Sequence, residues 1–231
     1  GATVRPGLRS LADGWSFLRR APNIRLQYIL DIIAMTFGNP LALFPAIGAV
    51  LLGGGPITTG VLTASVAAGA FFSSLFSGPI GRVRRQGLGI ERSIQVFGAA
   101  TAAFGVVLLL AALGVFSPAG LGEDVANIPL IALAMVLLAV TGAADNVSAI
   151  YRQTMMQSAV PDAIRGRLQG VFMVVVAGGP RVGALYAGTL ATVTALWFPP
   201  LVGGLVVVGL VGLLVSRSPR FRAYDALDPQ P

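Results

Sequence analysis

The stretch Thr141–Gly183 reads TGAADNVSAIYRQTMMQSAVPDAIRGRLQGVFMVVVAGGPRVG. An apolar run ends at Gly142–Ala144, and a second apolar run carries Gly178–Arg181 near its middle. The connector between them is polar, and its charged side chains include Arg152, Asp162, Arg165 and Arg167. Short loops rich in arginine stay on the cytoplasmic side of a membrane. The stretch therefore predicts two membrane-spanning helices joined by a short basic loop.

The composition of the whole chain supports this interpretation. Its 231 residues are 55% hydrophobic and only 11% charged, and the mean hydropathy is +0.81. A soluble domain averages about 25% charged residues. The net charge of +7 comes from 16 arginines against 9 acids. These arginines stand mainly between the apolar runs, which favours the positive-inside rule over nucleic-acid binding.

Six apolar runs are predicted as membrane spans, at residues 24–52, 58–80, 93–116, 128–150, 168–192 and 201–215. The loop arginines all fall on one side, which indicates that both termini are cytoplasmic. The expected fold class is all-α: a polytopic membrane protein with six transmembrane helices in two inverted three-helix repeats. Residues 1–23 are expected to form a cytoplasmic lead with an interfacial helix, 24–216 the bundle, and 217–231 a cytoplasmic tail. The interfacial helix is indicated by Leu8, Leu11, Trp15 and Leu18, which share one helical face.

Several motifs resemble those of major facilitator superfamily transporters. Pro161–Arg167 is similar to the P-[DE]-x-x-R-G-R loop of that superfamily. Gly142–Asp145 and Gly178–Pro180 resemble the G-A-A-D and G-G-P runs of its enterobactin-exporter-like branch, and Phe37–Pro45 adds a match near the start. The resemblance covers residues 8–222. It implies that the bundle is the C-terminal six-helix half of a twelve-helix transporter, one half of a major facilitator fold.

This resemblance implies a function. The chain would belong to an exporter, an antiporter coupled to protons, that moves siderophores or amphipathic small molecules by alternating access. Its partners would be the lipid bilayer, the cargo and the N-terminal six-helix half of the same parent polypeptide, in the bacterial inner membrane. The chain starts with glycine and lacks an apolar signal segment, so it is expected to begin inside a longer polypeptide.

The missing residue types argue against other functions. Histidine, cysteine and lysine do not occur, so metal ligation by histidine or cysteine, imidazole or thiol catalysis and a lysine-containing phosphate loop are all excluded. We therefore expect no enzyme activity, cofactor or metal. A six-span scaffold or channel subunit without transport activity of its own stays open as the alternative.

Three residues are candidates for the substrate and proton pathway: Asp31, Arg181 and Asn39. Asp31 and Arg181 lie inside apolar runs, where a charge costs roughly 2.5–3.5 kcal/mol even on insertion scales and usually has a function. Arg181 follows Gly178–Pro180, which is expected to open the helix. It would face the missing half and bind an anionic cargo, or pair with an acid there. Asp31 would hold a proton, pair with an arginine or gate the inner mouth, and Asn39 lies in the motif Phe37–Pro45.

The other candidates form a cytoplasmic gate or loop motif, which consists of Asp145, Arg152, Asp162, Arg165 and Arg167. Asp145 would accept hydrogen bonds from the loop backbone or pair with Arg152. Arg165 and Arg167 would contact helix C-termini or neighbouring acids. The resemblance implies that such a loop latches one conformation of the transporter, whereas simple anchoring of the topology is the alternative.

Overall fold

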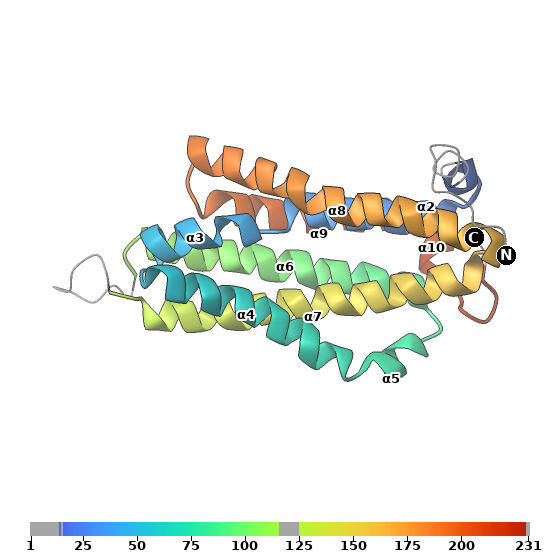
Figure 1. Cartoon of the computed structure of the whole chain (residues 1–231), viewed down its shortest axis with the longest axis horizontal. Coiled ribbons are helices and arrows are strands. Elements are labelled where there is room, and N and C mark those ends of the chain that lie inside the picture. Colours follow the sequence, from blue (N-terminus) through green and yellow to red (C-terminus); the bar gives the residue numbers. More distant parts are fainter. Residues whose placement is uncertain (1–13, 15, 116–124, 230–231) are drawn as a thin grey trace.

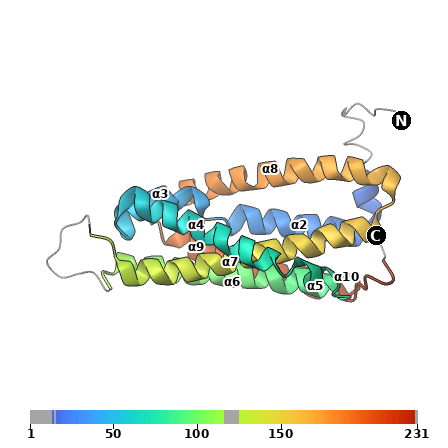
Figure 2. The ribbon, with the colours of Figure 1, turned by 60° about the horizontal axis from the view of Figure 1, so that its bottom comes forward.

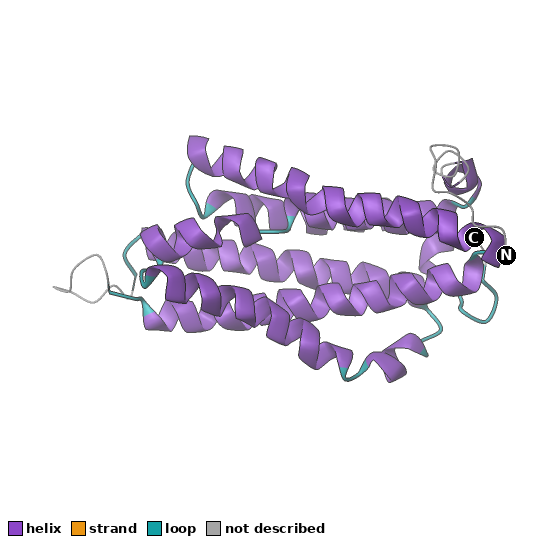
Figure 3. Ribbon diagram, viewed as in Figure 1, coloured by secondary structure: helices purple, strands orange, loops and turns teal. Residues whose placement is uncertain are grey.

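The structure, a computed structural model, describes residues 14, 16–115 and 125–229. In these ranges the chain folds into helices without a β-strand (Figure 3). Residues 16–20 are helical. Leu8, Leu11 and Trp15, on which the predicted interfacial helix mainly depends, lie outside the described residues.

Six helical segments of the described chain are long and apolar enough to span a membrane. The first consists of α2 (Pro22–Phe37) and a series of short turns: η1 (Leu41–Leu43), α3 (Phe44–Ala46) and η2 (Ile47–Leu51). The other five are α4 (Gly55–Ser74), α6 (Gln86–Ala112), α7 (Ile128–Ala159), α8 (Asp162–Val193) and α9 (Phe198–Ser216). Two short helices, α5 (Ser77–Gly81) and α10 (Pro219–Arg222), lie near the right-hand end of the bundle in Figure 1. The chain is therefore a multi-pass, all-α membrane protein, as the sequence predicts.

The first span breaks where the sequence places its prolines. α2 ends at Phe37, and the chain continues through a 3₁₀ turn and a π turn rather than a regular α-helix. Pro40 and Pro45 each lack the N–H that an α-helix would use. Asn39 stabilises the break, because its Oδ1 accepts a hydrogen bond of 3.1 Å from the Leu41 N–H. The first span is therefore kinked after Phe37.

The helices pack as an elongated bundle. α6 and α7 lie together, α4 packs against α7, and α9 packs against α6. α8 lies along α2, on the side of the bundle away from α4 (Figures 1 and 2). Small residues allow the closest approach: a Cβ on Gly69 would lie 1.8 Å from the Ala139 carbonyl oxygen, and one on Gly142 would lie 2.0 Å from the Val66 carbonyl oxygen. The contact between α4 and α7 therefore requires glycine on both helices.

The buried apolar side chains form two clusters along the long axis. The first cluster includes Ile24, Leu30, Met155 and Phe221, and it belongs to the end of the bundle where α2 begins and α10 lies. The second includes Phe44, Phe104 and Leu138, and it belongs to the opposite end. The bundle thus has two stacked apolar cores rather than one continuous core.

One boundary differs from the sequence prediction. Residues 151–167 were expected to form a basic loop, but α7 continues to Ala159 and α8 begins at Asp162. The segment from Tyr151 to Ala159 contains neither glycine nor proline, so nothing in it stops the helix before Pro161. Arg152 consequently lies inside α7 and is buried, and the expectation that it belongs to a loop is wrong.

Candidate functional site

A group of three charged side chains lies inside the bundle. Asp31 Oδ1 on α2 forms an ion pair with Arg152 Nη1 on α7, and Arg152 Nη2 lies 3.6 Å from Asp145 Oδ1 on the same helix. The side chains of Asp31 and Arg152 are only 4% and 9% exposed, whereas that of Asp145 is 44% exposed. Arg152 is therefore held between the buried Asp31 of α2 and the more accessible Asp145 of its own helix, α7.

The helical geometry explains the contact within α7. Asp145 and Arg152 are seven residues apart, which is about two turns, so they share one face of the helix. Long helical side chains point back toward the N-terminus, and this direction brings the guanidinium toward Asp145. Arg152 Nε also donates to the Ser148 carbonyl oxygen at 3.4 Å, one turn before it. These contacts orient the guanidinium toward both carboxylates.

Polar and aromatic side chains surround the ion pair. A small cavity of ≈ 10 Å³ is lined by Asp31, Arg152, Gln27, Tyr28, Gln153, Met156 and Phe172. That volume is close to what a single water molecule needs. The Tyr28 hydroxyl donates to the Leu168 carbonyl oxygen at 3.4 Å, and this contact links α2 to α8. The Oε1 atom of Gln27 is buried and has no hydrogen-bond partner among the described residues. The buried pair thus lies in a tight polar pocket between α2, α7 and α8.

Two of the predicted candidates line a second cavity, which has a volume of ≈ 120 Å³. Asn39 and Asp145 both line it, together with Met35, Pro40, Leu41, Phe44, Val66, Phe97, Leu138, Thr141 and Gly142. It lies where the first span breaks, between α2, α4, α6 and α7. Asp145 therefore contacts both Arg152 and this cavity. No cluster of three or more acids that could hold a metal ion occurs in the described part of the chain.

Arg165 of the loop motif caps the C-terminal end of α7. Arg165, in the first turn of α8, donates from Nη2 to the carbonyl oxygens of Gln157 at 2.8 Å and Val160 at 3.1 Å. The carbonyls in the last turn of a helix lack partners within that helix, and a guanidinium can satisfy them. Of the two predicted contacts for Arg165, the structure shows the one to a helix C-terminus. Arg167 is half-buried in the same turn, and Asp162 begins α8, with its side chain outside the described part.

Arg181 lies apart from this group. Its side chain is exposed on α8, and it forms no ion pair with any described residue. α8 continues through Pro180 without a break, so the expected opening of the helix is wrong. Proline is tolerated inside membrane helices when the freed backbone group finds another partner. That Arg181 faces a second bundle stays a prediction.

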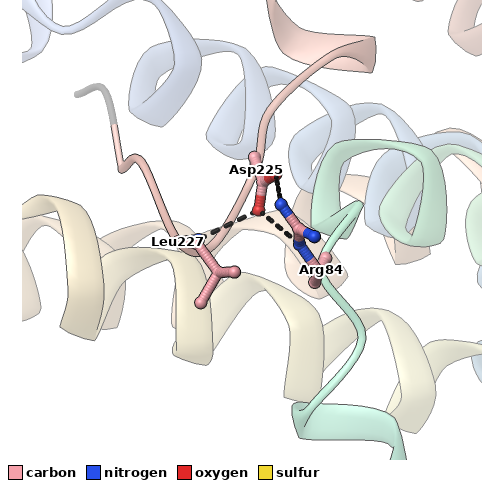
Figure 4. A network of polar contacts seen from close by, with 3 residues as sticks. All are labelled: Arg84, Asp225 and Leu227. Atoms are coloured by element: carbon pink, nitrogen blue, oxygen red, sulfur yellow. Dashed lines mark hydrogen bonds and ion pairs between the residues drawn. The ribbon is translucent and has the colours of Figure 1, made fainter.

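The residues after α9 fold back onto the bundle. Arg84 donates to Asp225 through Nε at 3.2 Å and Nη2 at 2.6 Å, and the Leu227 N–H donates to the same carboxylate at 3.0 Å (Figure 4). The Arg84 guanidinium, followed by the Leu227 N–H, lowers the pKa of Asp225 below its usual value. Arg222 Nε lies 3.1 Å from the buried Glu91. These contacts hold the C-terminal segment against the start of α6.

Comparisons with known proteins agree with this architecture. Residues 7–231 match the protein family described as "Transmembrane secretion effector", which is part of the major facilitator superfamily. The chain is also 29% identical over 225 residues to proteins named enterobactin exporter EntS from Escherichia coli O139:H28, Shigella boydii serotype 18 and Escherichia fergusonii. Each alignment covers 96% of this chain and 48% of the relative, so the chain spans about half the length of these relatives. The comparison with solved structures gives no match. With a family match over nearly its whole length and six helices able to span a membrane, the chain belongs to the transmembrane secretion effectors of the major facilitator superfamily.

Proposed function

We propose that this chain is the C-terminal six-helix half of an exporter for siderophores or amphipathic small molecules. Its family consists of transmembrane secretion effectors, and relatives named as enterobactin exporters align with it over about half their length, 48%. The second half would be the N-terminal six-helix bundle of the same parent polypeptide, and the cargo would pass between the two bundles.

The same proposal assigns an orientation. Arg84 pairs with Asp225, which follows α10. The connector that carries Arg82, Arg84 and Arg85 therefore lies at the same end of the bundle as Arg217 and Arg220. Arginine in short loops marks the cytoplasmic side. This end, called the basic end below, would therefore face the cytoplasm of a bacterium, and the turn at 53–55 would lie outside.

One observation supports the mechanism most directly: the buried ion pair between Asp31 and Arg152 joins two different spans. Charges inside a membrane protein are costly, and they are kept where they serve transport or hold helices together. Arg152 has a second carboxylate, Asp145, within 3.6 Å. Such an arrangement has two states, because the guanidinium can be shared between both acids or held by one of them.

Asp145 is the acid that would take up the proton. It lines the ≈ 120 Å³ cavity and is the more exposed of the two carboxylates. A proton on Asp145 removes its negative charge and leaves Arg152 paired with Asp31 alone. Uptake of the proton would thus change the contact between α2 and α7, which are the helices that line this cavity together with α4 and α6. In this mechanism Asp31 holds Arg152 in place, and the protonation state of Asp145 determines whether the guanidinium is shared between both acids or held by Asp31 alone.

A transport assay tests the proposal. The full-length parent protein is reconstituted into proteoliposomes, and export of enterobactin or an amphipathic dye is followed with and without a pH gradient. The Asp145→Asn variant should still transport slowly but should lose its response to the gradient, because the residue can no longer exchange a proton. Asp225→Asn serves as the matched control, since it removes an acid from the C-terminal segment outside the spans. A wild-type response to the gradient in Asp145→Asn would refute the coupling role.

A further inference from the structure

A cavity of ≈ 580 Å³ lies at the basic end, between α2, α9 and α10. It is separate from the charged group described above. Its lining includes Arg25 on α2, Arg217 directly after α9 and Arg220 in α10. The apolar side chains of Leu26, Ile29 and Leu214 also line it. Its volume is within the range of small-molecule sites, which is about 300–1,000 Å³.

The three arginines of this cavity carry uncompensated charge. Elsewhere at this end, Arg84 is paired with Asp225, and Arg222 is paired with Glu91. By contrast, Arg25, Arg217 and Arg220 are exposed and have no carboxylate within 4.0 Å among the described residues. Three guanidinium groups that line one cavity, with no carboxylate paired to them among the described residues, favour an anion there, and phosphate suits their planar donors.

The apolar side chains that line the cavity continue into exposed apolar surface on α2. Ile29 is 38% exposed, and Ile32, which is 41% exposed, follows it on the same face of α2. On α9, Leu213 is 44% exposed beside the cavity residue Leu214. The surface therefore changes from basic to apolar along the helix axis, within a distance of about two helical turns.

We propose that this cavity binds one anionic phospholipid, such as phosphatidylglycerol, from the leaflet at the basic end. Its phosphate would lie among Arg25, Arg217 and Arg220, and an acyl chain would run over Ile29 and Ile32. Basic pockets between membrane helices bind such headgroups. A free phosphate ion would leave the apolar wall uncovered, and a zwitterionic lipid would bring no net negative charge to three cations.

Native mass spectrometry of the purified chain tests the proposal. The protein is released from detergent in the presence of phosphatidylglycerol or of phosphatidylcholine with the same acyl chains, and bound lipid is counted per protein. We expect one tightly bound phosphatidylglycerol and much weaker binding of phosphatidylcholine. In the triple variant Arg25→Gln, Arg217→Gln and Arg220→Gln, phosphatidylglycerol should bind about a hundredfold more weakly, because each arginine near a headgroup contributes about fivefold.

A matched variant controls for general charge. Arg82→Gln, Arg85→Gln and Arg92→Gln removes the same number of positive charges from another part of the basic end. It should bind phosphatidylglycerol nearly as well as the wild type. Both variants are first compared with the wild type by size-exclusion chromatography and thermal melting. If either triple variant fails to fold, the single variants Arg217→Gln and Arg82→Gln take their places. We expect Arg217→Gln to bind phosphatidylglycerol about fivefold more weakly than the wild type, and Arg82→Gln to bind it with unchanged affinity.

Three results would overturn the proposal. The first is equal binding of phosphatidylglycerol and phosphatidylcholine. The second is equal loss of binding in the cavity variant and the control variant, which would mean that net charge alone attracts the lipid. The third is displacement of the lipid by millimolar glycerol phosphate, which would identify the cavity as a site for a soluble anion. None of these readouts depends on transport.

Discussion

Replacing Arg152 with methionine should destabilise the bundle strongly, and replacing both partners of its ion pair should not. In the Arg152→Met variant, the Asp31 carboxylate, which is only 4% exposed, loses its cation, and the described residues offer it no other. Breaking a buried pair on one side costs about 3–5 kcal/mol, because the remaining charge stays buried without a partner. Asp31→Leu should cost less, because Arg152 keeps the Asp145 carboxylate as a partner at 3.6 Å.

The double variant, Asp31→Leu with Arg152→Met, separates stability from transport. Apolar replacement of a whole buried pair is neutral or stabilises by about 1–4 kcal/mol, so the double variant should be at least as stable as the wild type. Its transport should still be absent, because the two-state contact between α2 and α7 is gone. This combination, a stable protein without activity, would show that the pair serves the mechanism rather than the fold.

The assay combines reversible unfolding in mixed micelles with transport in proteoliposomes. Replacement of Arg84 by methionine provides the control, because its pair with Asp225 is 64% and 33% exposed and should matter much less. Our reasoning fails if Arg152→Met is as stable as the wild type, since the buried Asp31 carboxylate would then carry no cost without its cation. It also fails if the double variant transports normally.

Three further predictions concern other arginines. Arg165→Gln should destabilise the protein by about 1–2 kcal/mol through the loss of two hydrogen bonds to the end of α7. The control variant Arg92→Gln should not destabilise it. Equal unfolding curves for Arg165→Gln and the wild type would contradict the capping role. The pair of Arg84 and Asp225 should add a little stability at neutral pH. Because the folded pKa of Asp225 is lowered, this contribution is present above its unfolded pKa of about 3.9 and is lost as the pH falls through the folded value. Melting curves of the wild type and Asp225→Asn should therefore differ at pH 6 and converge in acid, and a constant difference would refute the assignment. Arg181→Ala should insert normally but export anionic cargo more slowly, with partial rescue by Arg181→Lys; unchanged export would exclude a cargo role.

The spans were predictable because their signal is long and local. About 20 apolar residues suffice to cross a bilayer, and each run predicted from the sequence corresponds to one of the six helical spans found among the described residues. The prolines likewise locate the break after α2, because the loss of an N–H acts at a single position. The positions of the spans and of the break in the first span are therefore predictable, because both depend on residues that are close in the sequence.

The sequence names pairing with an arginine as one possible role of Asp31, and the structure shows such a pair, but the sequence does not identify Arg152 as the partner. The positive-inside rule assigns arginines between apolar runs to cytoplasmic loops. It therefore assigns Arg152 to a loop, although the structure shows it buried inside α7. A signal was present: Arg152, Met155, Met156 and Ala159 follow helical spacing, and no helix breaker occurs before Pro161. The partner itself depends on how α2 packs against α7, and no local pattern carries that information.

The two stacked cores have a mechanical consequence. Between them lies the level at which the first span loses its regular helix, beside the cavity that Asn39 and Asp145 line. Bending a close-packed rod requires many side chains to separate at once, whereas bending at a junction between two blocks requires few. We expect the first span to bend at this level, whereas α6, α7 and α8 pass it as unbroken helices. A small change of angle at this break would displace the outer part of the first span relative to α2, and in the proposed mechanism the proton on Asp145 would alter a contact directly beside it.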